Sequence, residues 1–362
     1  MTASPLARFD ATITRLGVVF APDGRPEEAE GVLNPATVRA RDGALLLYPR
    51  AVAAGNISRV EIARGTLRDD DIHFERLGFA LEPQAEYELR APGSGGMGCE
   101  DPRVTFIPVL DRYVMAYTSF GPSGPRITVA LSHDGYIWER LGLADFSAPG
   151  LPSGDDKDGA FFPEPVRSPN GVLSLAFYHR PMLRLSTLDG RAAVPTILDL
   201  PPEDRETTRI AYVPLEPVLS DITNLLKVRE SAVVLAPDGA WGRIKTGGGT
   251  PPVRIAEGWF SIYHGVDAID HGGKYTMCYS AGFVIHDIDQ PHHVIYRSHQ
   301  PAMSPEGVDE LHGIVSNVVF PTGIDVRADR TFEFYYGMAD ARIGRARLEL
   351  APAMAAADEN AA

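Results

Sequence analysis

The stretch Tyr113–Phe120, YVMAYTSF, alternates apolar and small side chains, and polar or small residues follow its second tyrosine at once. This period of two, with β-branched and aromatic residues, predicts a β-strand. The pattern recurs in ALLLYPR (44–50), LSLAFYHR (173–180), WFSIYHGVD (259–267) and TFEFYYGMAD (331–340). These copies stand too far apart to form hairpins with one another, so we expect a repeated sheet unit.

Partner runs with their own turn signals follow most of these strands, and Asp134-Gly135 and Gly272-Gly273 are two such signals. Runs joined in this way form antiparallel meanders. Five four-stranded meanders predict an all-β, five-bladed β-propeller, whose radial repetition protects the sheet edges. A pair of β-sandwiches is the competing fold, but it gives no reason for five tyrosine-ended strands at this spacing. We expect one propeller domain over 1–350 and a flexible tail over 351–362.

The composition disfavours several classes of protein. Among 362 residues there are 35 glycines and 30 prolines, which favours turns over helical bundles. The net charge of -14 repels nucleic acid and anionic membranes, so neither is an expected partner. No apolar run is long enough to span a bilayer, and two cysteines without a CxxC pair fit a reducing compartment. These features predict a cytoplasmic protein.

Propeller geometry predicts where chemically active side chains gather. The innermost strand of each blade lines a central channel, so the residues at which such strands end meet at one mouth. With the tyrosine-ended strands in that place, charged and polar residues collect there. They are Arg50, Arg59, Thr118, His179, Arg180, His264 and Asp340. Each one alone is typical of a solvated loop, but the set at one phase of a repeat indicates a site.

The segment GSGGMGCEDPRV (93–104) places Glu100, Asp101 and Arg103 behind a glycine-rich approach. Glycines let the backbone come close to a ligand. A carboxyl group beside another acid and near apolar side chains keeps its proton at higher pH, because burial and like charge both raise its pKa. Asp101 is therefore a candidate general acid. The alternative is a turn residue whose ion pair is Arg103.

Two further segments carry lysines. SGDDKDGAFFPEPV places Lys157 among acids before an aromatic-proline run. If Lys157 lies in a cleft, it binds anions; the alternative is a charged residue of a solvated loop, which does not. KTGGGTPPV (245–253) has its lysine before the glycines and does not match a phosphate loop, so we expect a tight hairpin and no nucleotide site. No HExxH or similar pattern supports a metal.

Eight ordered motifs resemble glycoside hydrolase family 130, the β-mannoside phosphorylases and related mannosidases, which are five-bladed propellers. The resemblance covers most of the chain. The motifs are LNPATV (33–38), LLYPR (46–50), GCEDPRV (98–104), DKDGAFFPEPV (156–166), YHRP (178–181), GWFSIYHGV (258–266), SNVVFPTG (316–323) and YYGMAD (335–340). A stretch that includes 200–217 is longer than in the family and is expected to shape the acceptor side.

The resemblance implies roles for individual residues. Asp101 corresponds to the general acid, which in the phosphorylases acts through the 3-hydroxyl of the sugar. The residues implied to bind the substrate are Asn34, Arg50, Glu100, Arg103 and Asp340. Those implied to bind phosphate are Lys157, Arg180 and His264, with Arg59 as a further member. An incoming phosphate dianion needs such converging cations.

The leading hypothesis is an inverting phosphorylase that cleaves a β-mannoside with inorganic phosphate and releases α-mannose 1-phosphate. No metal or organic cofactor is expected, the partners are a small oligosaccharide and phosphate, and a homo-oligomer is compatible with the sequence. An inverting β-mannosidase is the second hypothesis. It needs another carboxylate as base, for which Glu164 and Asp340 are the candidates. A non-catalytic carbohydrate-binding propeller is the third, and it has no use for Glu100 and Asp101 beside a cationic cluster.

Overall fold

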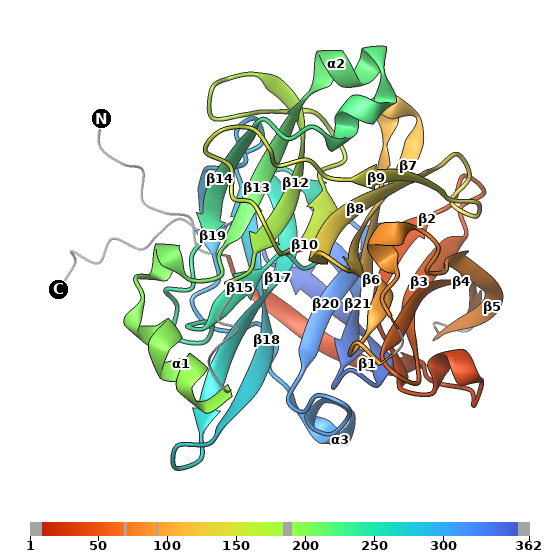
Figure 1. The fold of residues 1–362 in the computed structure, drawn as a ribbon, viewed down its shortest axis with the longest axis vertical. Helices are drawn as coiled ribbons and strands as arrows, with labels where there is room; N and C mark the ends of the chain where they lie inside the picture. Colours follow the sequence, from red (N-terminus) through yellow and green to blue (C-terminus); the bar gives the residue numbers. More distant parts are fainter. Residues whose placement is uncertain (1–8, 69–70, 92, 184–189, 354–362) are drawn as a thin grey trace.

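The computed structural model describes residues 9–68, 71–91, 93–183 and 190–353, and these residues form an all-β molecule (Figure 1). Four hydrogen-bonded sheets surround a common centre, and no closed barrel forms within these ranges. The arrangement is propeller-like. Residues 354–362 of the expected tail lie outside the described residues.

The largest sheet is built from two antiparallel meanders. The first contains β2 (Gly31–Arg39), β3 (Leu45–Ala53), β4 (Ile57–Arg68) and β5 (Asp71–Leu81). The second contains β6 (Met97–Ile107), β7 (Arg112–Gly121), β8 (Gly124–Ser132) and β9 (Glu139–Leu143). A short parallel pairing, Ile57 with Met97 and Ser58 with Gly98, joins β4 to β6. Each meander is thus a nearly separate four-stranded unit.

The next two sheets have five strands each. One orders β10 (Asp156–Phe161), β12 (Leu173–Pro181), β13 (Thr208–Pro214) and β14 (Glu230–Leu235), with β11 (Val166–Arg167) also on β12. The other contains β17 (Gly258–Asp270), β18 (Tyr275–His286) and β19 (Val294–Arg297). Both β15 (Lys245–Gly247) and β16 (Val253–Ile255) pair with β17. The predicted tight hairpin over 245–253 is therefore wrong, because the two strands extend along one partner.

The last sheet joins strands from both ends of the sequence. It orders β1 (Ala11–Phe20), β22 (Arg342–Leu350), β21 (Thr331–Met338) and β20 (Val319–Ala328). In Figure 1 the red β1 lies beside the blue strands of this sheet, at its edge. Its register runs from Ala11 opposite Leu350 to Phe20 opposite Ile343.

Helices are short and peripheral. The α-helices are α1 (Gly190–Asp199), α2 (Leu215–Ser220) and α3 (Gly307–Leu311). The 3-10 turns are η1 (Pro26–Glu28), η2 (Glu86–Glu88), η3 (Pro108–Leu110), η4 (Pro202–Asp204) and η5 (Ile222–Leu226). None of the helices in the described ranges has the length and apolar character needed to cross a membrane.

The apolar core lies between neighbouring sheets. Each large cluster of buried side chains takes its members from two adjacent sheets or meanders, as where Phe260 of β17 stacks on Phe332 of β21 at 4.7 Å. Trp138 and Trp259 are buried in these interfaces. Sheets that pack face to face around a centre leave their first strands at the axis.

The tyrosine-ended strands hold the second place in each sheet or, in the eight-stranded sheet, in each meander. They are β3, β7, β12, β17 and β21, and each has a hydrogen-bonded neighbour on both sides. The strands in front of them are innermost, since β2 packs against β6 and β20, and β6 packs against β10. The prediction that the tyrosine strands line the centre is therefore wrong. Their tyrosines are buried because they pack between sheets.

Candidate active site

Three innermost strands carry the same local distortion. Asn34 in β2, Asp101 in β6 and Asp158 in β10 have left-handed backbones, with φ of 44°, 46° and 64°. Each stands where the register with the next strand shifts, and each precedes a proline or glycine. Such a bulge turns a side chain away from the regular alternation, and Asn and Asp tolerate this conformation best. The bulges supply one polar side chain from each strand to the centre.

The first group of contacts surrounds the carboxylate of Asp101. Its Oδ1 accepts hydrogen bonds from Asn34 Nδ2 at 2.9 Å and from Arg50 Nη1 at 3.0 Å. The other guanidinium nitrogen of Arg50 donates to Glu100 Oε1 at 3.1 Å. Lys157 Nζ donates to Glu100 Oε2 at 2.8 Å. We call these five residues the Asp101 network.

The pKa values of two carboxyl groups, those of Asp101 and Asp340, are shifted in opposite directions. Burial opposes the charged form of Asp101, but the charges of Arg50 and Lys157 outweigh it, so the pKa of Asp101 is lowered. The expectation of a raised pKa at Asp101 is wrong, because the charges of the neighbouring cations outweigh the effect of burial. Burial instead raises the pKa of Asp340 to about 6, and the negative charges of Asp101 and Glu100 act in the same direction.

The second group of contacts surrounds Asp158, which is closed off from solvent. Arg180 Nε donates to its Oδ2 at 2.7 Å, and Arg103 Nη2 lies 3.4 Å from its Oδ1. His264 Nε2 lies 3.7 Å from Oδ2. Arg180 also forms an ion pair with Glu206 through Nη1. We call these five residues the Asp158 network.

Arg103 joins the two networks. Its Nη1 donates to the backbone oxygen of Asp101 at 2.9 Å, and its other nitrogens reach the carbonyl oxygens of Gly248 and Gly249 at 3.1 and 3.2 Å. Its side chain has no exposed surface. Arg103 therefore holds together the strands that carry the site, and its implied contact with the substrate stays a prediction.

Glycines allow this close packing. A Cβ on Gly247 would lie 2.3 Å from Asp158 Oδ2 and 2.3 Å from the His264 ring. A Cβ on Gly249 would lie 2.1 Å from the carbonyl oxygen of Ile262. Only glycine fits at such distances. The run that begins at Lys245 thus builds the floor of the site.

His264 is a buried polar group with unused hydrogen-bonding capacity. Neither of its ring nitrogens has a hydrogen-bond partner in the described part of the chain. Burial lowers its pKa to about 3, so the ring is neutral at physiological pH. Phe320 packs on it with ring centroids 4.4 Å apart. Unpaired buried polar groups are rare and need an explanation, and a ligand is one.

Two predicted residues lie apart from both networks. Arg59 Nε lies 3.4 Å from Glu82 Oε1, and its guanidinium lies over Phe79. Glu164 forms an ion pair with Arg254 at 2.6 Å, and both side chains are largely exposed. Neither residue forms a hydrogen bond or ion pair with a network member within the ranges that the structure describes. Glu164 is thus badly placed for the base of a hydrolase, and Asp340 is the better placed of the two candidates.

Sequence reasoning missed Asp158, Glu206 and Lys245. Lys245 Nζ lies 5.3 Å from the centre of the Tyr279 ring. Burial is the main cause of the lowered pKa of His264, and the charge of Lys245 lowers it further. A signal for Asp158 was present. The runs LNPA (33–36), EDPR (100–103) and KDGA (157–160) each place Asn or Asp before Pro or Gly, which marks the same bulge in three strands.

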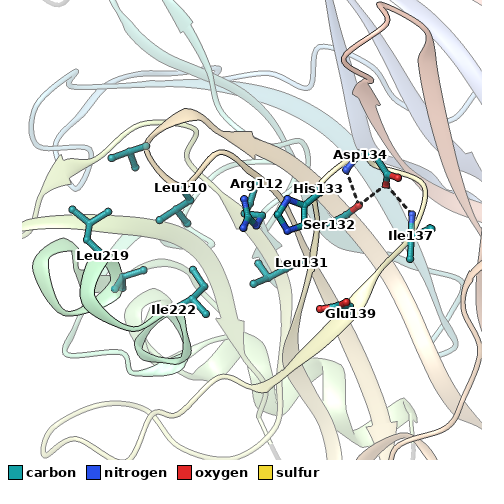
Figure 2. A pocket seen from close by; sticks show the side chains of 12 residues that line it. Leu110, Arg112, Leu131, Ser132, His133, Asp134, Ile137, Glu139, Leu219 and Ile222 are labelled. Atoms are coloured by element: carbon teal, nitrogen blue, oxygen red, sulfur yellow. Dashed lines mark hydrogen bonds between the residues drawn. The ribbon is translucent and has the colours of Figure 1, made fainter.

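Two hollows lie near the surface. One, of about 530 Å³, is lined by Glu30, Asn56 and 93–97 among others and adjoins the Asp101 network, because Asn56 Oδ1 accepts from Arg50 Nη2 at 3.4 Å. The other, of about 610 Å³, lies between the β7–β9 meander and α2. Figure 2 shows its apolar side chains, Leu110, Leu219 and others, beside His133 and Asp134. No residue of either network lines that second hollow.

The described residues contain no group of three or more His, Cys, Asp or Glu side chains placed to hold a metal ion. They do contain the carboxylate of Asp101, the cations Lys157 and Arg180 on neighbouring strands, and the buried neutral ring of His264. Such an arrangement binds a neutral polar molecule beside an anion and supplies an acid or base between them.

Comparison with known proteins identifies a family with this arrangement of motifs. The model of glycoside hydrolase family 130, described as beta-1,4-mannooligosaccharide phosphorylase, matches residues 6–189 and 224–359. The chain belongs to this family. A 1,2-beta-oligomannan phosphorylase of Thermoanaerobacter sp. (strain X514) is 31% identical over 306 residues, which cover 83% of this chain and 82% of that protein. The resemblance drawn from the eight motifs is confirmed.

Solved structures show the fold of family 130. The β-1,2-mannobiose phosphorylase of Listeria innocua, in complex with β-1,2-mannobiose, is 20% identical, with a TM-score of 0.65 over 93% of this chain and 96% of its own. Another, with 20% identity and a TM-score of 0.66 over 96% and 95%, belongs to work on family members that hydrolyse β-1,2-mannosidic linkages in Candida mannan. At this identity the similarity shows a shared fold.

Proposed function

We propose that the protein is an inverting glycoside phosphorylase, which cleaves a β-mannoside with inorganic phosphate and releases α-mannose 1-phosphate. Membership of family 130 supports this, as does the similarity to a protein named 1,2-beta-oligomannan phosphorylase over most of both chains. The substrates are then a small mannoside and phosphate, with no metal or organic cofactor.

One observation carries the proposal. Lys157 of β10 and Arg180 of β12 stand directly opposite each other in the antiparallel register. Like charges in that relation destabilise a sheet. Carboxylates brace both of them, Glu100 on Lys157 and Asp158 on Arg180. Lys157 lies near the Asp101 carboxylate and Arg180 stands across from it in the register, so the two cations fit an anionic co-substrate, and phosphate is the one that the phosphorylases of the family use.

The reaction then uses the two networks for different steps. A phosphate oxygen attacks the anomeric carbon while the bond from that carbon to the leaving oxygen breaks, and the configuration inverts. The leaving oxygen takes a proton from the 3-hydroxyl of the mannosyl unit, and Asp101 supplies a proton to that hydroxyl. The pKa of Asp101 is lowered in the free protein, so the proton reaches it only after sugar and phosphate have changed its surroundings. Asn34 and Arg50 keep the carboxylate in place.

The sugar positions follow from the same geometry. The non-reducing mannosyl unit lies over Asp101, within reach of Asn34, Arg50 and Asp340. The leaving sugar takes the hollow of about 530 Å³ next to Asn56. The volume of this hollow falls within the range of roughly 300–1,000 Å³ that is common for ligand pockets. It therefore has room for one or two sugar units.

Hydrolysis is the second candidate, because Asp340 is a carboxyl group near Asp101 and has the raised pKa of about 6. An inverting hydrolase needs a base on the opposite side of the sugar from its acid, to activate water. Family members that hydrolyse β-1,2-mannosidic linkages share the fold. Lys157 and Arg180 have less obvious work in such an enzyme, whose nucleophile is neutral.

The finer description of the molecule is also part of the proposal. The eight-stranded sheet counts as two blades, since only the short β4–β6 pairing joins its meanders, and five blades result. The apolar clusters between successive blades support a closed ring. A cytoplasmic location agrees with two free cysteines, Cys99 and Cys278. Assembly into a homo-oligomer is compatible with this fold.

The test uses purified protein with β-1,2- and β-1,4-mannobiose, with and without phosphate, and analysis of the products. We expect mannose 1-phosphate of the α configuration, at a rate that rises with phosphate and saturates. Lys157→Ala is expected to raise the KM for phosphate more than the KM for mannobiose, whereas Lys274→Ala, at an exposed hairpin, changes neither. Full-rate release of free mannose in phosphate-free buffer would assign the protein to the hydrolases.

A further inference from the structure

Arg180 is held by two carboxylates at once. Its Nε donates to Asp158 Oδ2 at 2.7 Å, and its Nη1 forms an ion pair with Glu206. The Asp158 side chain is 1% exposed and the Glu206 side chain 15%, so Glu206 lies on the side nearer solvent. Nη2 of Arg180 has no hydrogen-bond partner among the residues described. The guanidinium is therefore offered to the site with one of its two terminal nitrogens already occupied.

Glu206 is held firmly in this position. Its backbone oxygen accepts from Thr246 N at 3.1 Å, in an isolated bridge to Lys245. Its Oε1 accepts from Leu183 N at 3.3 Å. It thus ties the chain after β12 and the start of β15 to Arg180. Neighbouring Glu203 points to solvent and is exposed.

The segment that supplies Glu206 is a distinctive part of this chain. The family model matches residues up to 189 and again from 224, and Glu206 lies between these two ranges. The other members of the two networks all lie within the matched ranges. Glu206 therefore adds a negative charge to a site whose other residues lie in the ranges that the family model matches.

The added charge opposes phosphate binding. A guanidinium binds phosphate best through two parallel N–H groups, and Glu206 occupies one of the two that Arg180 could use. A carboxylate in contact with the same nitrogen also repels a dianion by Coulomb interaction in a poorly solvated site. Phosphate can then gain a two-nitrogen contact with Arg180 only if the Glu206 carboxylate leaves Nη1. The same competition applies to the phosphate group of the product.

We propose that Glu206 competes with phosphate for Arg180, and so weakens the binding of phosphate and promotes the release of the sugar phosphate. This inference rests on the proposed phosphorylase activity for its role in turnover, but the competition itself concerns the binding of an anion. Glu206 is then the residue that sets the phosphate requirement of this enzyme.

The experiment compares Glu206→Gln with Glu203→Gln as the matched control in the same segment. The amide keeps the size of the side chain and removes its charge. We expect the KM for phosphate to fall about tenfold in Glu206→Gln, since hydrogen bonds between charged groups are the strong ones that phosphate would regain. The KM for mannobiose stays unchanged, and the KM for mannose 1-phosphate in the synthetic direction falls in parallel. Glu203→Gln behaves as the unaltered protein.

Direct titration of inorganic phosphate into the sugar-free protein separates this inference from the proposed function. Tighter binding by Glu206→Gln supports the competition even if turnover proves to be hydrolytic. Equal or weaker binding, with the variant folded, overturns it and makes Glu206 a residue that orients Arg180. If Glu206→Gln does not fold, Glu206→Asp keeps the charge on a shorter side chain and is expected to tighten phosphate binding by a smaller factor, and unchanged binding there overturns the inference too.

Discussion

Asp101 and Asp158 stand at the same kind of bulge in adjacent innermost strands, yet their surroundings differ. The side chain of Asp101 is 8% exposed and contacts Asn34 and Arg50 at the edge of the open site. Asp158 is 1% exposed and lies between Arg103 and Arg180. The same backbone device therefore produces a carboxylate that can meet a substrate in one strand and a buried counter-ion in the next. Position in the sequence repeat does not decide which of the two a residue becomes.

The largest difference between the two carboxylates is expected in turnover. Asp101→Asn removes the group that gives and takes the proton, and general acid–base catalysis contributes roughly 10²–10⁴-fold. We expect a loss of that size in kcat on mannobiose with phosphate, with little change in Tm, because Arg50 keeps its bond to Glu100. A variant with a near-normal rate on a substrate with a poor leaving group would exclude Asp101 as the acid.

At Asp158 we expect the larger effect on stability, whereas at Asp101 it is on turnover. Asp158→Asn leaves Arg103 and Arg180 without the carboxylate between them, and removing one partner of a buried ion pair costs about 3–5 kcal/mol. We expect the free energy of unfolding in urea to fall by that amount. Asp101→Asn, measured in parallel, serves as the control. Equal stability of the two variants would mean that the comparison between them is mistaken.

Asp340 gives a pH-dependent test of the open side. Because its pKa is about 6 in the folded protein, above the ordinary value of 3.8, the folded state holds a proton that the unfolded state loses between these values. The contribution of Asp340 to the free energy of unfolding therefore decreases as pH rises from 4 to 7. Asp340→Asn removes this contribution and should gain about 3 kcal/mol over the unaltered protein at pH 7, with little difference below pH 4.

Urea unfolding of both proteins at several pH values checks this prediction. A constant difference across the range would show that Asp340 titrates normally. Chloride at constant ionic strength is a suitable background, because phosphate would bind the same site.

The smallest effect is expected outside both networks. Glu164→Gln breaks an exposed ion pair with Arg254, and such pairs contribute roughly 0–1 kcal/mol. Both kcat and the KM for phosphate should remain as in the unaltered protein. A large loss of mannoside turnover in this variant would place Glu164 in the reaction and reopen the hydrolase assignment with a different base.

The sequence was informative where chemistry repeats with the strands. The alternation around Tyr117 and its four counterparts predicted paired antiparallel strands, and the motifs around Asn34, Asp101 and Lys157 indicated residues that the structure brings into contact. It could not show that each tyrosine strand is second in its sheet or meander. A strand paired on both sides and one that lines a channel can have the same apolar alternation.

The pKa values could not be predicted either, because they depend on distances across strands. The neighbour of Asp101 in sequence is Glu100, which favoured a raised pKa. Its neighbours in space include Arg50 and Lys157, whose charges lower it. Glu206 is the clearest case. Nothing in PPEDRETT marks one acid from the next, and only the folded chain shows that one of them reaches Arg180.

The pairing of β1 with β22 has a consequence for biosynthesis. The ribosome makes β1 before the other strands of these sheets, yet its hydrogen-bonding partner, which ends at Leu350, is completed hundreds of residues later. Until then β1 has an unsatisfied backbone edge, and the last sheet lacks a strand. Non-local pairing of this kind is slow and leaves edges open to other chains. A circular permutant that places β1 directly after β22 would make the two strands consecutive, and it should give a higher yield of folded protein after dilution from urea.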